Sequence, residues 1–347
     1  MTMKCSLARA IIVATVALAA AGPASAQDAV EQFYKGKQIY MVIGSDVGGG
    51  YDSYARVVAR YLGNYIPGKP TIVPQNMPGA GSNKAAAYVY GVAPKDGTVI
   101  GAIQPGAILQ PLLGEAPVQH EPSKSIYVGS ANSDVYLCLA RADAPAKSFQ
   151  ETFTKEITLG ASGQGATTRD LPMMLNNVLG TKLRLVSGYA GTREITLAIE
   201  RGEVHGICGL GWTSLAATHP DWLTNGTIKI LAQETTRGQP DMNKMGVPLA
   251  LSFAKTDEDR QVMELVYSQG LFGRPYLLAP GVPPKRVAAL RKAFMATMQD
   301  KEFLADAQKM KLDIDPLSGE DVQAMVAKVY ALSPNVVARA KQALQQQ

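Results

Sequence analysis

The stretch IYMVIGSDVGGGYDSYARVVARYL, residues 39–62, decides the fold of this chain. It begins with five apolar residues, continues through three consecutive glycines, and then places apolar or aromatic residues at positions 54, 57, 58, 61 and 62. That last spacing indicates a helix, and the uninterrupted apolar run indicates a buried strand. The stretch therefore predicts a strand, a tight loop and a helix.

The same order of strand, glycine loop and helix recurs three times. The recurrences occupy residues 71–73, 77–81 and 83–90; residues 157–159, 161–165 and 170–179; and residues 183–186, 187–191 and 192–201. Strands and helices that alternate in this way predict an α/β protein with largely parallel sheets. Three later helices, at 285–299, at 301–310 and from Ser318 onward, are expected to cover a sheet built earlier.

Length and composition limit the class of protein. The chain has 347 residues, 46% hydrophobic and 18% charged, with a net charge of +5. This composition is typical of soluble globular proteins, and the length exceeds what one hydrophobic core usually supports, so we expect about two domains. The sequence has no run of lysine and arginine that could neutralise a row of phosphates, so we expect no nucleic-acid partner.

Residues 1–26 have the pattern of a secretory signal peptide. Lys4 and Arg9 precede an apolar run at 10–21, and the small residues ASA follow at 24–26. A run of twelve is too short to cross a bilayer as a helix, and no other window reaches about 18 apolar residues. We therefore expect an exported chain without stable membrane insertion.

The two cysteines beyond this segment are Cys138 and Cys208. An oxidising compartment permits a disulfide between them, but their separation along the chain does not show whether they meet. The favoured interpretation is that they are two small apolar residues at the ends of buried strands.

The glycine loops favour an anionic ligand. Each follows a strand and precedes a helix, where free backbone N–H groups and the positive end of the helix face the ligand. Nucleotide phosphates fit poorly, because residues 48–53 lack the third glycine of a dinucleotide-binding loop and no Gly-Lys-Ser/Thr occurs. A small carboxylate is the better candidate. The alternative is that the loops are ordinary turns.

Residues for catalysis or metal binding are sparse. His120, His205 and His219 are scattered, with none four residues from another or beside a cysteine pair. No Gly-x-Ser-x-Gly nucleophile motif is present. We expect no catalytic residue, no metal and no cofactor. An exported hydrolase or lyase using the same cleft is the less favoured alternative.

Three motifs together resemble the Bug family, the substrate-binding proteins of tripartite tricarboxylate transporters. They are GGGYDSYAR at 48–56, QNMPGAGS at 75–82 and APKDGT at 93–98, and the similarity in order and spacing extends over essentially the whole mature chain. The resemblance implies a periplasmic-binding-protein-like α/β fold, in which crossing strands join two lobes around a ligand cleft. We expect residues 27–130 and 253–347 to form the first lobe and residues 131–252 the second.

The resemblance also implies a function. Such a receptor works in the periplasm, binds a small organic acid between its lobes, and delivers it to a membrane permease of one large and one small subunit. We expect the chain to be a monomer. A periplasmic receptor that presents its ligand-bound form to a two-component sensor is the alternative with the same binding chemistry.

The expected ligand-binding residues lie on the glycine loops and the strand ends beside them. They are Ser45, Gly48, Gly49, Gly50, Tyr51, Asp52, Gly79, Ala80, Gly81, Ser82, Gln104, Ser162, Gly163, Gly165, Thr167, Thr168, Tyr189 and Arg193. Arg193 is the candidate clamp for a carboxylate, or else a surface residue paired with a nearby glutamate. Asp52 either caps its helix or accepts a ligand hydroxyl through water. Tyr51 and Tyr189 either stack on a planar ligand or wall the cleft.

The first loop departs from the pattern usual in the Bug family. Gly44, Ser45 and Asp46 stand where the family has proline and an aromatic residue. An acidic side chain at this point would repel a ligand carboxylate unless it points away or meets an amine or hydroxyl of the ligand.

Overall fold

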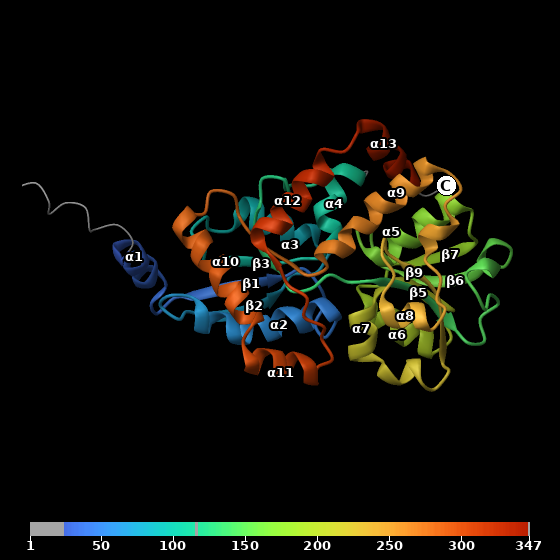
Figure 1. Cartoon of the computed structure of the whole chain (residues 1–347), viewed down its shortest axis with the longest axis horizontal. Coiled ribbons are helices and arrows are strands. Elements are labelled where there is room, and N and C mark those ends of the chain that lie inside the picture. Colours follow the sequence, from blue (N-terminus) through green and yellow to red (C-terminus); the bar gives the residue numbers. More distant parts are fainter. Residues whose placement is uncertain (1–23, 115–116, 346–347) are drawn as a thin grey trace, which may run out of the picture.

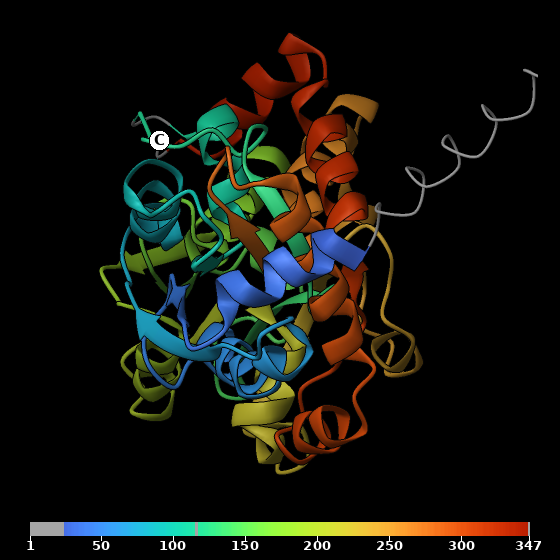
Figure 2. The same ribbon diagram turned by 90° about the vertical axis from the view of Figure 1, so that its left-hand side faces the viewer.

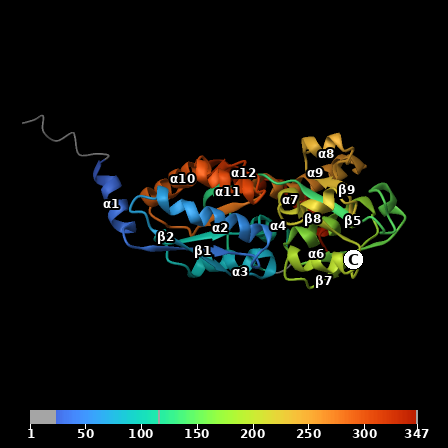
Figure 3. The ribbon, with the colours of Figure 1, turned by 90° about the horizontal axis from the view of Figure 1, so that it is seen from below.

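The computed structural model describes residues 24–114 and 117–345, which form two α/β lobes, each built around one sheet (Figure 1). The predicted signal peptide, residues 1–26, falls almost entirely outside this range. Seen from below, the lobes lie next to each other along the long axis, with helix α1 (Ala24–Tyr34) at the far end of the first lobe (Figure 3). Figure 2 looks along that axis from the end where α1 lies. In the part of the chain that is described, no helix is both long and apolar enough to cross a membrane.

The sheet of the first lobe has six strands in the order β11-β4-β10-β3-β1-β2. The pairs β1–β2 and β1–β3 are parallel, whereas β10 and β11 pair antiparallel with their neighbours. The strands are β1 (Gln38–Ile43), β2 (Thr71–Asn76), β3 (Val99–Ala102), β4 (Ile126–Ser130), β10 (Pro275–Leu278) and β11 (Leu317–Ser318). Around them lie α2 (Gly50–Leu62), α3 (Asn83–Ala87), α4 (Gly106–Leu113), α10 (Pro284–Met298), α11 (Lys301–Lys309) and α12 (Gly319–Tyr330).

The sheet of the second lobe has five strands in the order β7-β6-β8-β5-β9. Strand β6 runs parallel to β7 and β8, whereas β5 runs antiparallel to β8 and β9. The strands are β5 (Tyr136–Arg141), β6 (Ile157–Ala161), β7 (Leu183–Ser187), β8 (Gly206–Gly211) and β9 (Ile228–Glu234). The helices are α5 (Thr167–Met174), α6 (Thr192–Glu200), α7 (Trp212–Thr218), α8 (Pro240–Lys244), α9 (Asp257–Tyr267) and α13 (Pro334–Ala343).

All four predicted strand–loop–helix units are present, as β1–α2, β2–α3, β6–α5 and β7–α6. The three late helices are also confirmed, since α10 and α12 pack against β4 and α11 packs against α2. The prediction of largely parallel sheets is only partly right. Strands β5, β10 and β11 run antiparallel to their partners. These strands do not belong to the repeated strand–loop–helix unit, which places successive strands in parallel. They follow a passage of the chain between the lobes or a helix.

The chain passes from the first sheet to the second between β4 and β5, and returns before β10. Helices α9 and α13 contribute Val262, Val266 and Ala340 to the hydrophobic cluster that contains Leu159 of β6. Both helices therefore pack with the second sheet, although they lie in the range 253–347. The lobe boundaries given above remain a proposal.

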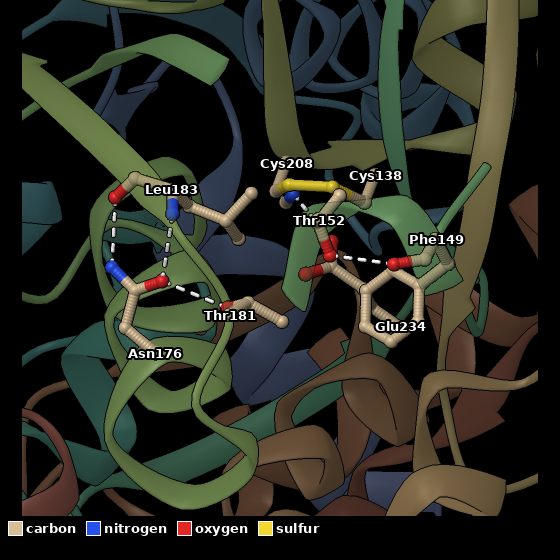
Figure 4. The surroundings of a disulfide bond; sticks show 9 residues. Cys138, Phe149, Thr152, Asn176, Thr181, Leu183, Cys208 and Glu234 are labelled. Atoms are coloured by element: carbon tan, nitrogen blue, oxygen red, sulfur yellow. Dashed lines mark hydrogen bonds between the residues drawn. A yellow bond between two sulfur atoms is a disulfide. The ribbon is translucent and has the colours of Figure 1, made fainter. Parts of the chain in front are cut away.

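Cys138 and Cys208 form a disulfide, so the favoured interpretation of two unpaired residues was wrong (Figure 4). They lie inside neighbouring strands β5 and β8, and neither is exposed. The strand register shifts at this point, leaving Cys208 and Gly209 opposite Cys138. Gly209 has a φ of 74°, and a β-carbon there would lie 2.3 Å from the Thr167 carbonyl oxygen. Glycine is therefore required beside the disulfide.

The disulfide closes a chain segment with a sequence separation of 70 residues. By its effect on the unfolded chain, such a crosslink stabilises the fold by about 4 kcal/mol. We predict that the double variant Cys138→Ala/Cys208→Ala unfolds at a clearly lower urea concentration than the wild type. Thiol titration of the unfolded, unreduced wild type should find no free cysteine at either position; two free thiols would contradict the bond.

Glu234, at the end of β9, is a buried carboxyl beside this disulfide (Figure 4). It is 1% exposed, and one of its oxygens lies within 4.8 Å of both sulfur atoms. Its Oε2 accepts the Gly209 N–H at 2.6 Å, whereas Oε1 has no partner among the described residues. Burial raises the pKa of Glu234 from 4.5 to about 8, so the side chain is mainly protonated at neutral pH.

This raised pKa predicts a pH-dependent stability. Between pH 4.5 and about 8 the folded chain holds a proton that the unfolded chain releases, so the contribution of Glu234 to the free energy of unfolding falls as pH rises through that window. Glu234→Gln removes the ionisation but keeps an acceptor for Gly209. Urea unfolding should show that the variant gains more stability over the wild type at pH 8 than at pH 5. An equal difference at both pH values would contradict this assignment.

Candidate functional site

A buried carboxylate shapes the loop between β1 and α2. Asp52 is 2% exposed, and its Oδ2 accepts the Gly48 N–H at 2.9 Å. Arg56 Nε and Asn76 Nδ2 donate to the same carboxylate at 2.9 and 2.8 Å. These internal donors favour the interpretation in which Asp52 fixes the start of α2. It does so from within the helix, by turning back to Gly48.

Residues 79–82 form a turn of four consecutive residues with positive φ, between 47° and 134°. Ala80 and Ser82 carry side chains in this conformation, which is costly unless the surroundings hold it. The Ser82 hydroxyl donates to the Gly44 carbonyl at 2.6 Å and accepts the Gln104 N–H at 2.9 Å. Ser82 thereby ties the turn to the ends of β1 and β3, where both strands face the second lobe.

The loop at 162–168 in the second lobe is also held by hydroxyl groups. Thr167 Oγ1 donates to the Gly209 carbonyl at 2.7 Å, which uses its hydrogen inside the lobe. Thr168 Oγ1 accepts the Ser162 N–H at 3.1 Å, so its own hydrogen can still point toward a ligand. Of these two threonines, Thr168 is therefore the better donor to a bound molecule.

The two lobes contact each other through glycines. A β-carbon on Gly106 would lie 1.9 Å from the Gly165 carbonyl oxygen, and one on Gly81 would lie 2.7 Å from the Gly165 carbonyl carbon. A β-carbon on Gly50 would lie 2.1 Å from Ser214 Oγ. Real side chains do not approach so closely, so the lobes meet in this way only because these positions lack a side chain.

The loops enclose two adjoining hollows between the lobes, which share Ser45, Gln104 and Ser162 in their linings. The expected ligand-binding residues that line them are Ser45, Gly49, Gly50, Tyr51, Gly79, Ala80, Gly81, Ser82, Gln104, Ser162, Gly163, Thr167, Thr168 and Tyr189.

The remaining four expected residues lie elsewhere. Asp52 is buried inside the first loop, and Gly165 lies at the contact between the lobes. Gly48 and Arg193, whose side chain is exposed, line a third hollow between the lobes, which shares Gly49, Gly50 and Thr192 with the first of the two. Arg193, the predicted clamp, therefore does not line the two hollows between the lobes.

Sequence reasoning missed Gly191 and Thr192. Both line the hollow between the lobes that is also lined by Tyr51 and Thr168. They stand between Tyr189 and Arg193 at the start of α6, so the strand–loop–helix pattern could have identified them. Asp46, noted above only as a departure, lines the same hollow. Burial raises its pKa, and the negative charges of Glu194 and Asp52 add to that effect.

Neither a comparison with family models nor one with curated proteins found a match to the sequence. Solved structures do match. The periplasmic binding protein BugD has a TM-score of 0.71 at 22% identity, covering 90% of this chain and 100% of its own. The chain shares the fold of Bug periplasmic binding proteins. Rpa4515 of R. palustris, solved with adipate, matches with a TM-score of 0.68 at 20% sequence identity. The match covers 88% of this chain and 97% of that protein. MatC of Rhodopseudomonas palustris, solved with bound malate, matches with a TM-score of 0.67 at 19% sequence identity. The match covers 89% of this chain and 99% of that protein.

In this periplasmic-binding-protein fold, a buried ion pair lies where the two lobes join. Arg274 Nη2 donates to Asp134 Oδ2 at 2.7 Å, and both side chains are at most 2% exposed. Asp134 also accepts from Thr213 of α7 at 3.0 Å. The Arg274 guanidinium stacks on the rings of Tyr51 and Tyr54 of α2, at 4.3 and 4.8 Å from their centroids. The pair thus connects helix α2 of the first lobe to helix α7 of the second.

Breaking this pair should destabilise the chain strongly, because Arg274 would stay buried without its counter-charge. We predict that Asp134→Asn lowers the free energy of unfolding by about 3–5 kcal/mol. The matched control is Asp143→Asn, which breaks an exposed pair with Arg141 and should have little effect. Urea unfolding of both variants is the measurement, and equal losses would contradict the role of the buried pair.

Proposed function

We propose that this chain is the periplasmic solute-binding receptor of a tripartite tricarboxylate-type transporter. It binds a small organic acid between its lobes and delivers it to a membrane permease of one large and one small subunit. The observation that supports this most is the convergence of glycine-rich loops from both lobes on the two hollows.

The chemistry of these loops suits an acid better than a sugar or a nucleotide. Helix α2 begins at Gly50 and α6 at Thr192, and residues at both starts line the same hollow. The N-terminal N–H groups of a helix lack partners within that helix, and its positive end attracts a carboxylate. The structural neighbours solved with adipate and malate are consistent with such a ligand.

A ligand that contacts both lobes at once would stabilise the closed arrangement of the lobes. Contacts from the first and second lobes exist together only when the lobes meet, so a ligand favours the closed arrangement by its differential affinity. The neighbours are binding proteins, which supports a role without catalysis. A receptor for a two-component sensor would use the same cleft and differ in its membrane partner.

Thermal unfolding of the mature chain tests the receptor function. The panel should contain di- and tricarboxylates, aromatic acids, amino acids and neutral sugars. A ligand at 100 times its dissociation constant adds about 2.7 kcal/mol, which should raise the midpoint by roughly 2 °C or more. We predict such a shift for at least one organic acid and for none of the sugars. A shift with a sugar alone would contradict the proposal.

The glycine contacts supply a matched pair of variants for the same assay. Gly106→Ala should abolish the ligand-induced shift, because its β-carbon would meet the Gly165 carbonyl and keep the lobes apart. Gly91→Ala places a β-carbon in open space and should keep the shift. If Gly106→Ala bound the ligand as tightly as the wild type, closure of the lobes would not be part of binding.

A further inference from the structure

The cleft has an unusual charge balance for a receptor of acids. Among the described residues that line the two hollows, Asp46 alone carries a charge, and that charge is negative. Arg193, whose side chain is exposed, lines the third hollow, which shares Gly49, Gly50 and Thr192 with the hollow beside Asp46. A ligand carboxylate placed beside Asp46 would therefore face an uncompensated like charge.

The Asp46 side chain points across the cleft from the first lobe toward the second. A β-carbon on Gly191 would lie 2.4–2.6 Å from three atoms of the Asp46 carboxyl group. On its own side, a β-carbon on Gly49 would lie 3.0 Å from Asp46 Oδ1. The carboxyl group thus fills the space between two glycines, at the meeting point of the first loop and the start of α6, and forms part of the wall of the ligand hollow.

Among the described residues, no lysine or arginine forms an ion pair with Asp46. Glu194 lies on α6, and its Oε2 accepts the Ala190 N–H at 2.8 Å. Asp52 is paired with Arg56 inside the loop. Both add negative charge near Asp46, and Arg193 has the weakest of these influences on it. A cationic group on the ligand would therefore pair with Asp46 in the closed cleft.

We infer that Asp46 determines specificity by binding a cationic nitrogen, so that the preferred ligand is an organic acid that also carries an ammonium group. This inference rests on the proposed function, which supplies the acid. The ammonium group would lie in the hollow lined by Asp46. One carboxylate would face the helix starts at Gly50 and Thr192 in the same hollow. The second would lie in the adjoining hollow, which is lined by uncharged residues of the turn at 79–82 and by Ser162 and Gly163.

Matched ligand pairs test the inference by calorimetry on the mature chain. Succinate is compared with aspartate, and glutarate with glutamate, because each pair differs only by the ammonium group. We expect the wild type to bind the better amino acid about tenfold or more tightly than its dicarboxylate partner, as a charge-assisted hydrogen bond allows. The Asp46→Asn variant should bind the amino acid about tenfold more weakly than the wild type does, and the dicarboxylate more tightly.

Glu194→Gln is the control variant, because it removes a neighbouring negative charge without changing the wall of the hollow. It should keep the wild-type preference. If the wild type bound the dicarboxylates as tightly as the amino acids, the inference would be overturned and the proposed function would stand. If neither kind of acid bound, the proposed function would fail, and the inference with it. The wild-type comparison decides the matter even if Asp46→Asn does not fold.

Discussion

Backbone-to-backbone contact between the lobes is the constraint on which the cleft depends. The carbonyl of Gly165 lies where a side chain on Gly106 would have to be, and Gly81 meets the same residue from another loop. A methyl group at either position would force the lobes apart. The glycines that the sequence suggested as ligand-binding residues thus have a second role, since several of them shape the contact between the lobes. Of these glycines, Gly48 and Gly165 line neither of the two hollows.

Polar side chains near the cleft are largely used to hold its loops. Asp52 binds the Gly48 amide, Ser82 links two strand ends, and Thr167 bonds across to β8. The residues that remain for a ligand are backbone N–H groups, a few hydroxyl and amide side chains, two tyrosines and Asp46. A site of this kind recognises its ligand by shape and by a small number of hydrogen bonds, so one additional charge in the wall has a large influence on specificity.

The sequence predicted the repeated units well because strand, glycine loop and helix are local patterns. The boundaries of β1, α6 and α10 fall within a residue or two of expectation. Pairing direction was harder, since the antiparallel strands β5 and β10 are placed by distant crossings. The disulfide was missed for a related reason: the bulge at Gly209 that brings Cys208 beside Cys138 depends on strand register, which spacing along the chain does not reveal.

The candidate site shows the same division between local and distant effects. Loop membership could be predicted from sequence, and most expected residues line the hollows. The direction of a side chain could not, as Arg193 and Asp46 show. Arg193 lines a different hollow from the one its position suggested, and Asp46 crosses to the opposite lobe. The Asp134–Arg274 pair joins residues 140 positions apart, so no local sequence pattern could have predicted it.

We propose that a small organic acid binds between the lobes, against loops from both. A crystal structure of the mature chain with its tightest organic acid tests it most directly. We expect density for the acid between the first loop, residues 44–50, and the loop at 162–168, with the lobes in contact at Gly106 and Gly165. An acid bound outside the cleft, or bound beside Arg193 and His219 without contact to the loop at 162–168, would overturn the proposal.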